Sequence, residues 1–184
     1  VPGLDAPAVV SDDVSGGYLA AEHLVKQGHH RIAAVFPPPY STARAREDGF
    51  RKALEDNGVE VRNEWIQYAC TDDPEPEKTM VEALFSQAER PTAIFAFHDE
   101  LAAAVFNHLK TRGLRVPEDV ALVGYNDCVI AMTLPVPLTS VAYPKYEIGA
   151  NAARLLLRGA RTASETIVLP PRLVVRASSV KKPK

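Results

Sequence analysis

A stretch in the middle of the chain has the pattern of a strand, a helix and a second strand. Residues 92–97 form a short, almost continuously apolar run, which is typical of a strand covered on both faces. Residues 99–112 carry apolar side chains at helical spacing, and Gly113 stands where helices commonly end in a left-handed conformation. Residues 120–123 are the next apolar run, and Gly124 is expected to let the chain turn sharply out of it. The stretch therefore predicts a βαβ unit.

The remainder of the chain continues this alternation. Further strands are predicted at residues 8–10, 32–36, 65–69, 138–142, 167–169 and 173–175, and further helices at 18–27, 43–57, 77–87 and 146–158. The glycines at which four of the helices are expected to end are Gly28, Gly58, Gly113 and Gly159. Residues 129–136 are expected to be irregular. Because strands alternate with helices of ten or more residues, the predicted fold class is α/β, a three-layer arrangement around a parallel sheet.

The bulk composition excludes several classes of protein. The 184 residues are 46% hydrophobic and 24% charged, as in ordinary globular proteins, and the net charge of −2 leaves no basic footprint for nucleic acid. No apolar run approaches the ~18 residues that a membrane helix needs. Cys70 and Cys128 share no local motif, which favours free structural thiols in a reducing compartment.

Motifs for catalysis and cofactor binding are absent from the sequence. No glycine-rich dinucleotide or phosphate loop and no Gly-x-Ser-x-Gly elbow occurs, and the pair Gly16-Gly17 is better explained by packing or a turn. Residues 98–100 read His-Asp-Glu, but adjacent side chains at a helix start point in different directions, which favours a polar helix N-terminus over a metal site. No metal, cofactor or enzymatic activity is predicted; an α/β enzyme is kept as a third hypothesis without residues to support it.

Polar side chains follow three of the predicted strands. Arg44 and Arg46 lie one loop beyond residues 32–36, His98 follows residues 92–97, and Asn126 follows residues 120–123. In open parallel sheets ligands bind outside the carboxyl ends of the strands, so these side chains converge on one rim if the strands are neighbours. Guanidinium and amide groups suit hydroxyl-bearing ligands.

Aromatic residues near this rim could form the walls of a small-molecule pocket; they are Phe97, Tyr125 and Tyr143. The alternative is that Arg46 pairs with a surface acid and Asn126 caps a turn.

Six motifs follow one another between residues 8 and 179. They read Ser-Asp-Asp-x-x-Gly-Gly-x-x-Ala-x-x-x-Leu-x-x-x-Gly-His-x-x-Ile, Arg-x-x-Gly-Phe-x-x-Ala-Leu, Pro-Thr-Ala-Ile-Phe, Val-Pro-Glu-Asp-Val-Ala-Leu-Val-Gly-Tyr-Asn-Asp, Pro-Leu-Thr-Ser-Val and Val-Arg-Ala-Ser. Together they resemble the effector-binding core of the LacI/GalR family of bacterial transcription regulators, whose fold is that of type I periplasmic sugar-binding proteins.

The resemblance implies a division into two lobes, with the chain crossing between them three times. Residues 1–12 and 145–160 would be a remnant of the N-terminal lobe, and residues 13–144 and 161–184 would form the C-terminal lobe. Most of the N-terminal lobe and the DNA-binding headpiece would lie outside this chain.

The resemblance also implies a set of ligand contacts. Arg46 matches the arginine that grips the effector, Thr42 a hydroxyl contact just before it, and Tyr143 a contact after the Pro-Leu-Thr-Ser-Val motif. His98 and Asn126 stand where the family commonly has Asn and Asp, and these departures bear on the identity of the ligand. The expected ligand-binding residues are therefore Thr42, Arg46, His98, Asn126, Asp127 and Tyr143.

The helix that begins at Asp99 is apolar almost all round over residues 101–106, although a helix on a sheet needs only one apolar stripe. The family uses this helix and the loop after Asn126 for dimerisation. A two-fold homodimer is therefore expected through Ala103, Phe106 and Met132.

The resemblance implies a cytoplasmic transcription regulator of the repressor type, in which a small sugar-like effector allosterically controls DNA binding. The alternative is a periplasmic sugar-binding protein that serves a transporter. The two differ in the residues before Val1, which would hold a helix-turn-helix or a signal peptide.

Overall fold

A computed structural model describes residues 6–38, 41–68, 74–159 and 165–180. Strands and helices alternate as far as β7, which β8 follows directly. The bounds are β1 (Ala8–Ser11), α1 (Asp13–Lys26), β2 (Ile32–Phe36), α2 (Ser41–Asp56), β3 (Ile66–Tyr68), α3 (Pro74–Ser86), β4 (Ala93–Ala96), α4 (Asp99–Thr111), β5 (Ala121–Tyr125), α5 (Val129–Thr133), β6 (Thr139–Ala142), α6 (Lys145–Leu157), β7 (Thr166–Leu169) and β8 (Arg172–Val174). Short 3-10 turns occupy Asn63–Trp65 and Ala177–Ser179. None of the described helices combines the length and the apolar character that crossing a membrane requires.

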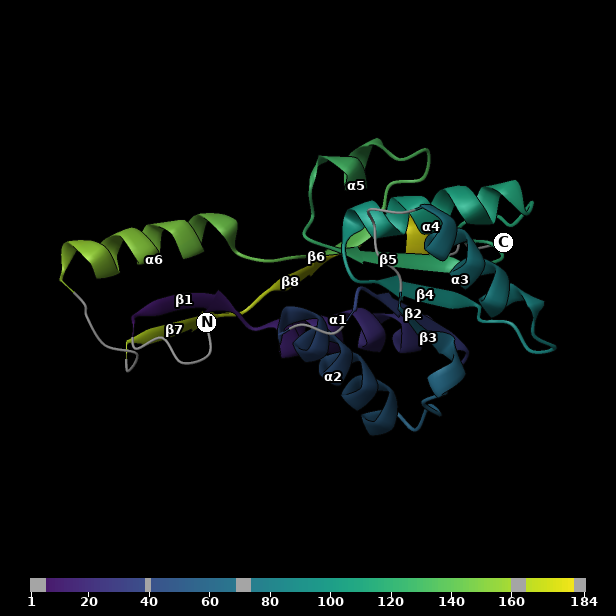
Figure 1. The fold of residues 1–184 in the computed structure, drawn as a ribbon, viewed down its shortest axis with the longest axis horizontal. Coiled ribbons are helices and arrows are strands. Elements are labelled where there is room, and N and C mark those ends of the chain that lie inside the picture. The colour runs from purple at the N-terminus through teal and green to yellow at the C-terminus, as the bar shows by residue number, and fades with distance from the viewer. Residues whose placement is uncertain (1–5, 39–40, 69–73, 160–164, 181–184) are drawn as a thin grey trace.

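The larger part of the molecule is a six-stranded sheet in the order β3-β2-β4-β5-β6-β8. All neighbouring strands are parallel except β8, which runs antiparallel to β6. Helices α1 and α2 cover one face, and α3 and α4 cover the other (Figure 1). Every residue of β2, β4 and β5 is buried, as their unbroken apolar sequences require. The predicted α/β class with three layers is therefore confirmed.

A smaller unit projects from one end of this sheet, and we call it the arm: β1 and β7, paired in parallel, together with α6 (Figure 1). The arm changes one expected boundary. Residues 166–169 were expected in the larger lobe, but they pair with β1 in register from Ala8 with Thr166 to Ser11 with Leu169. The chain returns to the larger sheet only after Pro170-Pro171, because proline lacks the N–H that a continuous strand would need.

The glycine pair lies inside α1, which begins five residues earlier than expected. Asp12 caps this helix, since its Oδ1 accepts a hydrogen bond from Ser15 N at 2.9 Å. A Cβ atom on Gly17 would lie 2.0 Å from the carbonyl oxygen of Arg46, and one on Gly49 would lie 1.9 Å from that of Val14. Helices α1 and α2 therefore touch backbone to backbone, which is the packing role predicted for the pair.

The sharp turn predicted at Gly124 is wrong. Strand β5 continues to Tyr125, and the chain turns at Asn126 and Asp127, whose φ angles are 100° and 48°. Gly124 is required for a different reason, because a Cβ atom there would lie 2.4 Å from Oδ1 of Asp99. The segment after the turn, expected to be irregular, begins with the short helix α5. The left-handed helix ends at Gly28, Gly58, Gly113 and Gly159 are confirmed.

Two helical glycines are expected to respond to alanine substitution in opposite directions, because only one of them lies in the contact between α1 and α2. Gly49→Ala should lower the free energy of unfolding by about 3 kcal/mol, because the new methyl group meets backbone that cannot move aside. Gly149→Ala, in a helix position with open space around it, should raise that free energy by about 0.5–1 kcal/mol. Urea titration of both variants checks this; equal effects of the two substitutions would contradict the close helix contact.

Candidate functional site

Arg46 forms the floor of the candidate site. It is only 7% exposed, and its guanidinium lies between the rings of Tyr125 and Phe97, 3.5 and 4.4 Å from their centroids. Its Nη1 donates to the carbonyl oxygen of Phe97 at 2.7 Å, and its Nε donates to Oδ1 of Asp13 at 2.9 Å. Arg46 thus pairs with an acid, as the alternative explanation proposed, but the pair is recessed at the ends of β4 and β5.

Asp13 joins three elements at this floor. Its Oδ1 also accepts a hydrogen bond from the hydroxyl of Tyr125 at 3.0 Å, so α1, α2 and β5 meet at one oxygen atom. Burial raises the pKa of Tyr125, which keeps its hydroxyl a proton donor at neutral pH. The carboxylate offsets the charge of Arg46, so this floor offers directed hydrogen-bond donors without a net positive charge.

His98 lies at the edge of the same floor and caps α4. Its Nδ1 accepts a hydrogen bond from Leu101 N at 3.0 Å. Burial lowers the pKa of His98. The ring is therefore neutral at pH 7, and because Nδ1 is the acceptor the proton sits on Nε2. The predicted polar helix N-terminus is confirmed. No group of three or more potential ligand side chains within the described part of the chain is arranged to hold a metal ion.

The turn at Asn126 and Asp127 forms the other side of the site. The two positive φ angles are uncommon for residues other than glycine, and Asn and Asp are among those that tolerate them best. Asn126 N donates to the carbonyl oxygen of Val141 at 2.8 Å. The carboxylate of Asp127 pairs with Arg176 at 2.7 Å, so an interaction within the chain already holds this expected ligand contact.

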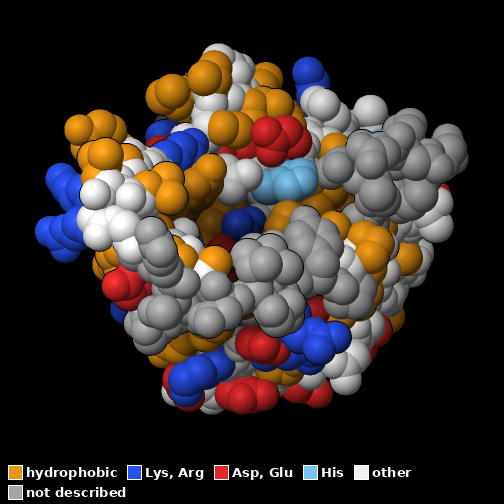
Figure 2. All heavy atoms as spheres, turned by 60° about the vertical axis from the view of Figure 1, so that its left-hand side comes forward, with side chains coloured by type: hydrophobic (Ala, Val, Ile, Leu, Met, Phe, Trp, Pro, Cys, Tyr) orange, Lys and Arg blue, Asp and Glu red, His pale blue; other side chains and the backbone are white. Residues whose placement is uncertain are grey.

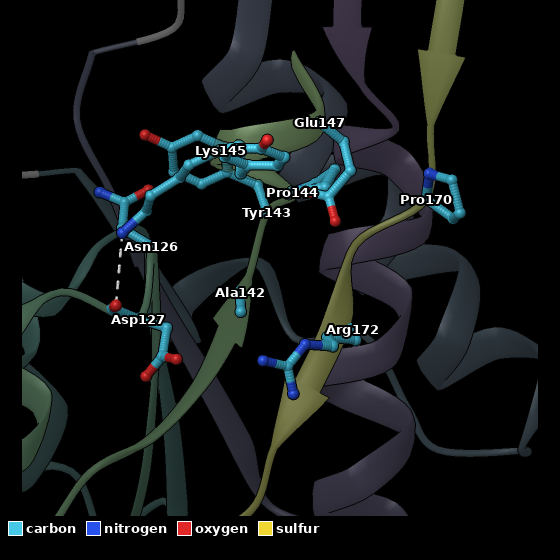
Figure 3. Close-up of a pocket in the computed structure, with 10 residues that line it drawn as sticks. Asn126, Asp127, Ala142, Tyr143, Pro144, Lys145, Glu147, Pro170 and Arg172 are labelled. Carbon is cyan, nitrogen blue, oxygen red and sulfur yellow. Dashed lines mark hydrogen bonds between the residues drawn. The ribbon is translucent and has the colours of Figure 1, made fainter. Parts of the chain in front are cut away.

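A pocket of about 400 Å³ opens beside this turn, where the chain passes into the arm (Figure 3). It is lined by Asn126, Asp127, Ala142, Tyr143, Pro144, Lys145, Tyr146, Glu147, Pro170 and Arg172. Lys145 Nζ donates to the carbonyl oxygen of Asp127 at 3.3 Å and lies 5.2 Å from the centroid of the Tyr143 ring. Aromatic, cationic and amide groups therefore share one cavity.

Thr42 lies in a separate pocket of about 290 Å³ between the start of α1 and the start of α2. Asp13 lines this pocket and also binds Arg46, so it connects the pocket to the floor. Viewed from the side of the arm, the surface is hollowed, with basic and acidic atoms recessed and a histidine at the edge (Figure 2). The predicted residues thus gather at one edge of the sheet, although in neighbouring pockets.

Sequence reasoning missed Asp13, Lys145 and Arg172. Asp13 carried a signal, since two acids follow the first predicted strand, but that strand belongs to the arm and the pairing with Arg46 is not visible from spacing. Lys145 follows β6, and Arg172 begins β8. The antiparallel pairing of these two strands, which brings the two residues near each other, is visible only in the folded chain.

The expected dimer residues differ in how much surface they offer. Ala103 and Phe106 are 7% and 6% exposed, because α4 packs against β5, α3 and α5 of its own chain. The nearly all-round apolar character of this helix is therefore explained within one chain. Met132 is 60% exposed and its neighbour Val129 is 70% exposed. Cys128 is a free thiol, and Cys70 lies outside the described residues.

Comparisons with known proteins agree on the type of domain. The periplasmic binding protein-like domain matches residues 21–179. The HTH-type transcriptional regulator DegA of Bacillus subtilis (strain 168) is 38% identical over 97% of this chain and 53% of DegA. The arabinose metabolism transcriptional repressor of Geobacillus stearothermophilus is 33% identical, over 96% of this chain and 50% of the repressor. The chain spans about half the length of these relatives.

Solved structures give the same result. The transcriptional regulator CelR in complex with cellobiose superimposes with a TM-score of 0.86 and 33% identity, over 97% of this chain and 55% of CelR. A regulatory protein of the LacI family from Chloroflexus aggregans superimposes with a TM-score of 0.86 and 29% identity, over 97% of this chain and 65% of that protein. This chain belongs to the family of periplasmic binding protein-like domains, in the form found in LacI-family transcription regulators.

Proposed function

We propose that this chain is the effector-sensing core of a cytoplasmic transcription regulator, of the repressor type, that binds a small sugar-like ligand. The observation that carries the proposal is the recessed group of Arg46, Asp13 and Tyr125, with Asn126 and Tyr143 lining the pocket beside it. Ligand binding at this edge would shift the balance between two arrangements of the larger sheet and the arm, and so control DNA binding by a headpiece outside this chain.

The chemistry of the floor favours a neutral ligand rich in hydroxyl groups. Asp13 offsets the charge of Arg46, and His98 is neutral, so the floor offers single donors and acceptors. Tyr143 adds an aromatic face against which the apolar side of a sugar ring can pack. CelR in its complex with cellobiose has the same fold, which supports a carbohydrate as the ligand here.

We propose that the arm is part of a second lobe, to which residues 6–12, 145–159 and 165–169 contribute. Its parallel pair of strands is too small to be stable alone, and Val10 and Val168 are exposed on it. Three connections join the arm to the larger sheet: before α1, before α6 and at Pro170-Pro171. This arrangement supports movement of one part against the other around the pocket, which lies at two of these connections.

A sugar-binding protein of a transporter would use the same pocket, and an enzyme would need catalytic groups in it. The relatives described above are named as regulators, which supports sensing over transport or catalysis.

Calorimetric titration of the full-length protein with a panel of pentoses, hexoses, disaccharides and phosphosugars tests the proposal. We expect saturable binding of a neutral sugar, because the floor carries no net charge, and weaker binding of its phosphorylated form. Absence of binding across the whole panel would refute the sugar assignment. Tighter binding of the phosphorylated form would contradict the claim that the floor carries no net charge.

Asn126→Gly separates function from stability. Glycine adopts the backbone conformation of this turn without strain, so the variant should gain about 1 kcal/mol in unfolding free energy. The loss of one side-chain hydrogen bond should weaken binding of the panel's best sugar about tenfold. Thermal unfolding and calorimetry measure the two effects. Arg44→Ala is the control that should change neither, because Arg44, which was expected at the rim, is exposed on α2 and lines neither pocket. An unchanged affinity in Asn126→Gly would place the ligand elsewhere.

We propose a two-fold homodimer through Ala103, Phe106 and Met132, in which Met132 and its neighbour Val129 on α5 supply the most exposed apolar side chains. The double variant Val129→Glu, Met132→Glu should then be monomeric in light scattering at a protein concentration where the parent chain is dimeric. Leu157→Glu is the matched control, because Leu157 is 89% exposed on α6, far from α5 (Figure 1). A monomeric parent chain at high micromolar concentration would contradict the dimer.

A further inference from the structure

Asp99 is a carboxylate without exposed surface that the ligand site itself does not explain. Its Oδ1 accepts a hydrogen bond from the hydroxyl of Ser140 at 2.6 Å, and its Oδ2 accepts one from Cys128 N at 2.8 Å. None of the ion pairs between described residues involves it. A carboxylate buried without a cation is costly, so its two hydrogen bonds indicate a specific task.

These hydrogen bonds hold the turn that follows β5. Ser140 Oγ donates to Asp99 and accepts a hydrogen bond from Asp127 N at 3.0 Å. The carboxylate thus holds Cys128 N directly and Asp127 N through the serine. Because Asn126 N is bound to the carbonyl oxygen of Val141, three successive N–H groups of the turn are anchored.

The turn needs such anchors because both of its central residues have positive φ. L-residues keep this conformation only where the surroundings enforce it. Strand β5 also makes room for the anchor, since Gly124 is the residue whose missing Cβ leaves space for Asp99 Oδ1. Asp127 is held from a third direction by Arg176, which pairs with its carboxylate.

The anchored turn has a different task at each end. Asn126, at its start, lines the pocket between the sheet and the arm. Cys128, at its end, is the residue from which α5 begins, and α5 carries the exposed side chains of Val129 and Met132. A change in the turn therefore moves a pocket residue and an exposed apolar surface together.

We propose that Asp99 and Ser140 are positioning residues: they clamp the Asn126–Cys128 turn, and so set the place of Asn126 in the pocket and the start of α5 by one device. The inference rests on the proposed function only in giving Asn126 a ligand, since the clamp acts whether or not a ligand is bound.

Two buried serines allow a matched test. Ser140 and Ser178 are both without exposed surface, and each hydroxyl donates one hydrogen bond and accepts one from a backbone N–H. Only Ser140 touches the turn, because the partners of Ser178 are the carbonyl oxygen of Leu122 and Thr139 N. Ser140→Ala and Ser178→Ala therefore lose the same number of hydrogen bonds at equal burial.

The readouts are amide hydrogen exchange and the spectrum of the ¹³C-labelled methionine methyl groups. The chain has two methionines, Met132 on α5 and the buried Met80 on α3, so the spectrum has one reporter and one internal reference. We expect Ser140→Ala to speed exchange at Asp127 N and Cys128 N at least tenfold beyond any change in global exchange. It should also shift the Met132 signal and the side-chain amide signal of Asn126, and leave Met80 in place.

Ser178→Ala should speed global exchange by about as much as Ser140→Ala does, without these local changes. Asp99→Asn, which keeps the shape but loses one acceptor oxygen, should reproduce the effect of Ser140→Ala. Unchanged turn amides in Ser140→Ala, or equal local changes in Ser178→Ala, would overturn the clamp. Faster exchange of the turn amides with an unchanged side-chain amide signal of Asn126 would overturn the link between the turn and the pocket. None of these readouts involves a sugar, so their outcome is independent of the titration panel.

Discussion

The backbone contact between α1 and α2 is the constraint on which the rest of the site depends. Glycines at positions 17 and 49 let the two helices approach until no Cβ atom fits between them. This approach brings Asp13, at the start of α1, within hydrogen-bond distance of Arg46 on α2. Gly16 makes a second close contact, between α1 and β5, because a Cβ atom there would lie 2.2 Å from the hydroxyl of Tyr125. Small residues on both helices thus bring together a charged group from three elements.

Several charged side chains at the edge of the sheet near the site are held away from water, and each has a partner within the chain. Arg46 is stacked between two aromatic rings and paired with Asp13, and the buried Asp99 is hydrogen-bonded to a serine and a backbone amide. Such groups are costly to bury alone and rigid once fully bonded. The edge of the sheet is therefore preorganised before any ligand arrives, which lowers the cost of ordering side chains on binding.

Local patterns predicted the elements well and their spatial relations poorly. The run at residues 32–36 and the glycine helix ends are determined by burial and by φ, which act on one segment at a time. The role of Gly124 was predicted wrongly, because the residue that leaves no room for a Cβ atom there is Asp99. Asp99 lies 25 positions earlier, and only the pairing of β4 and β5 brings it near. The low exposure of Ala103 and Phe106 could not be predicted either, because the covering of α4 by α3 and α5 leaves no trace in the helix's own period.

The sequence by itself determined the α/β class, the order of the elements and the polar residues that follow the strands, because these depend on periodicity and on the few residues that suit a turn. Only the tertiary structure decided that Asp13 neutralises Arg46, that residues 166–169 join β1, and that Asp99 holds the turn after β5. The reason is physical: pairing across a sheet or between helices joins residues far apart in sequence, and no local spacing records which of them will meet.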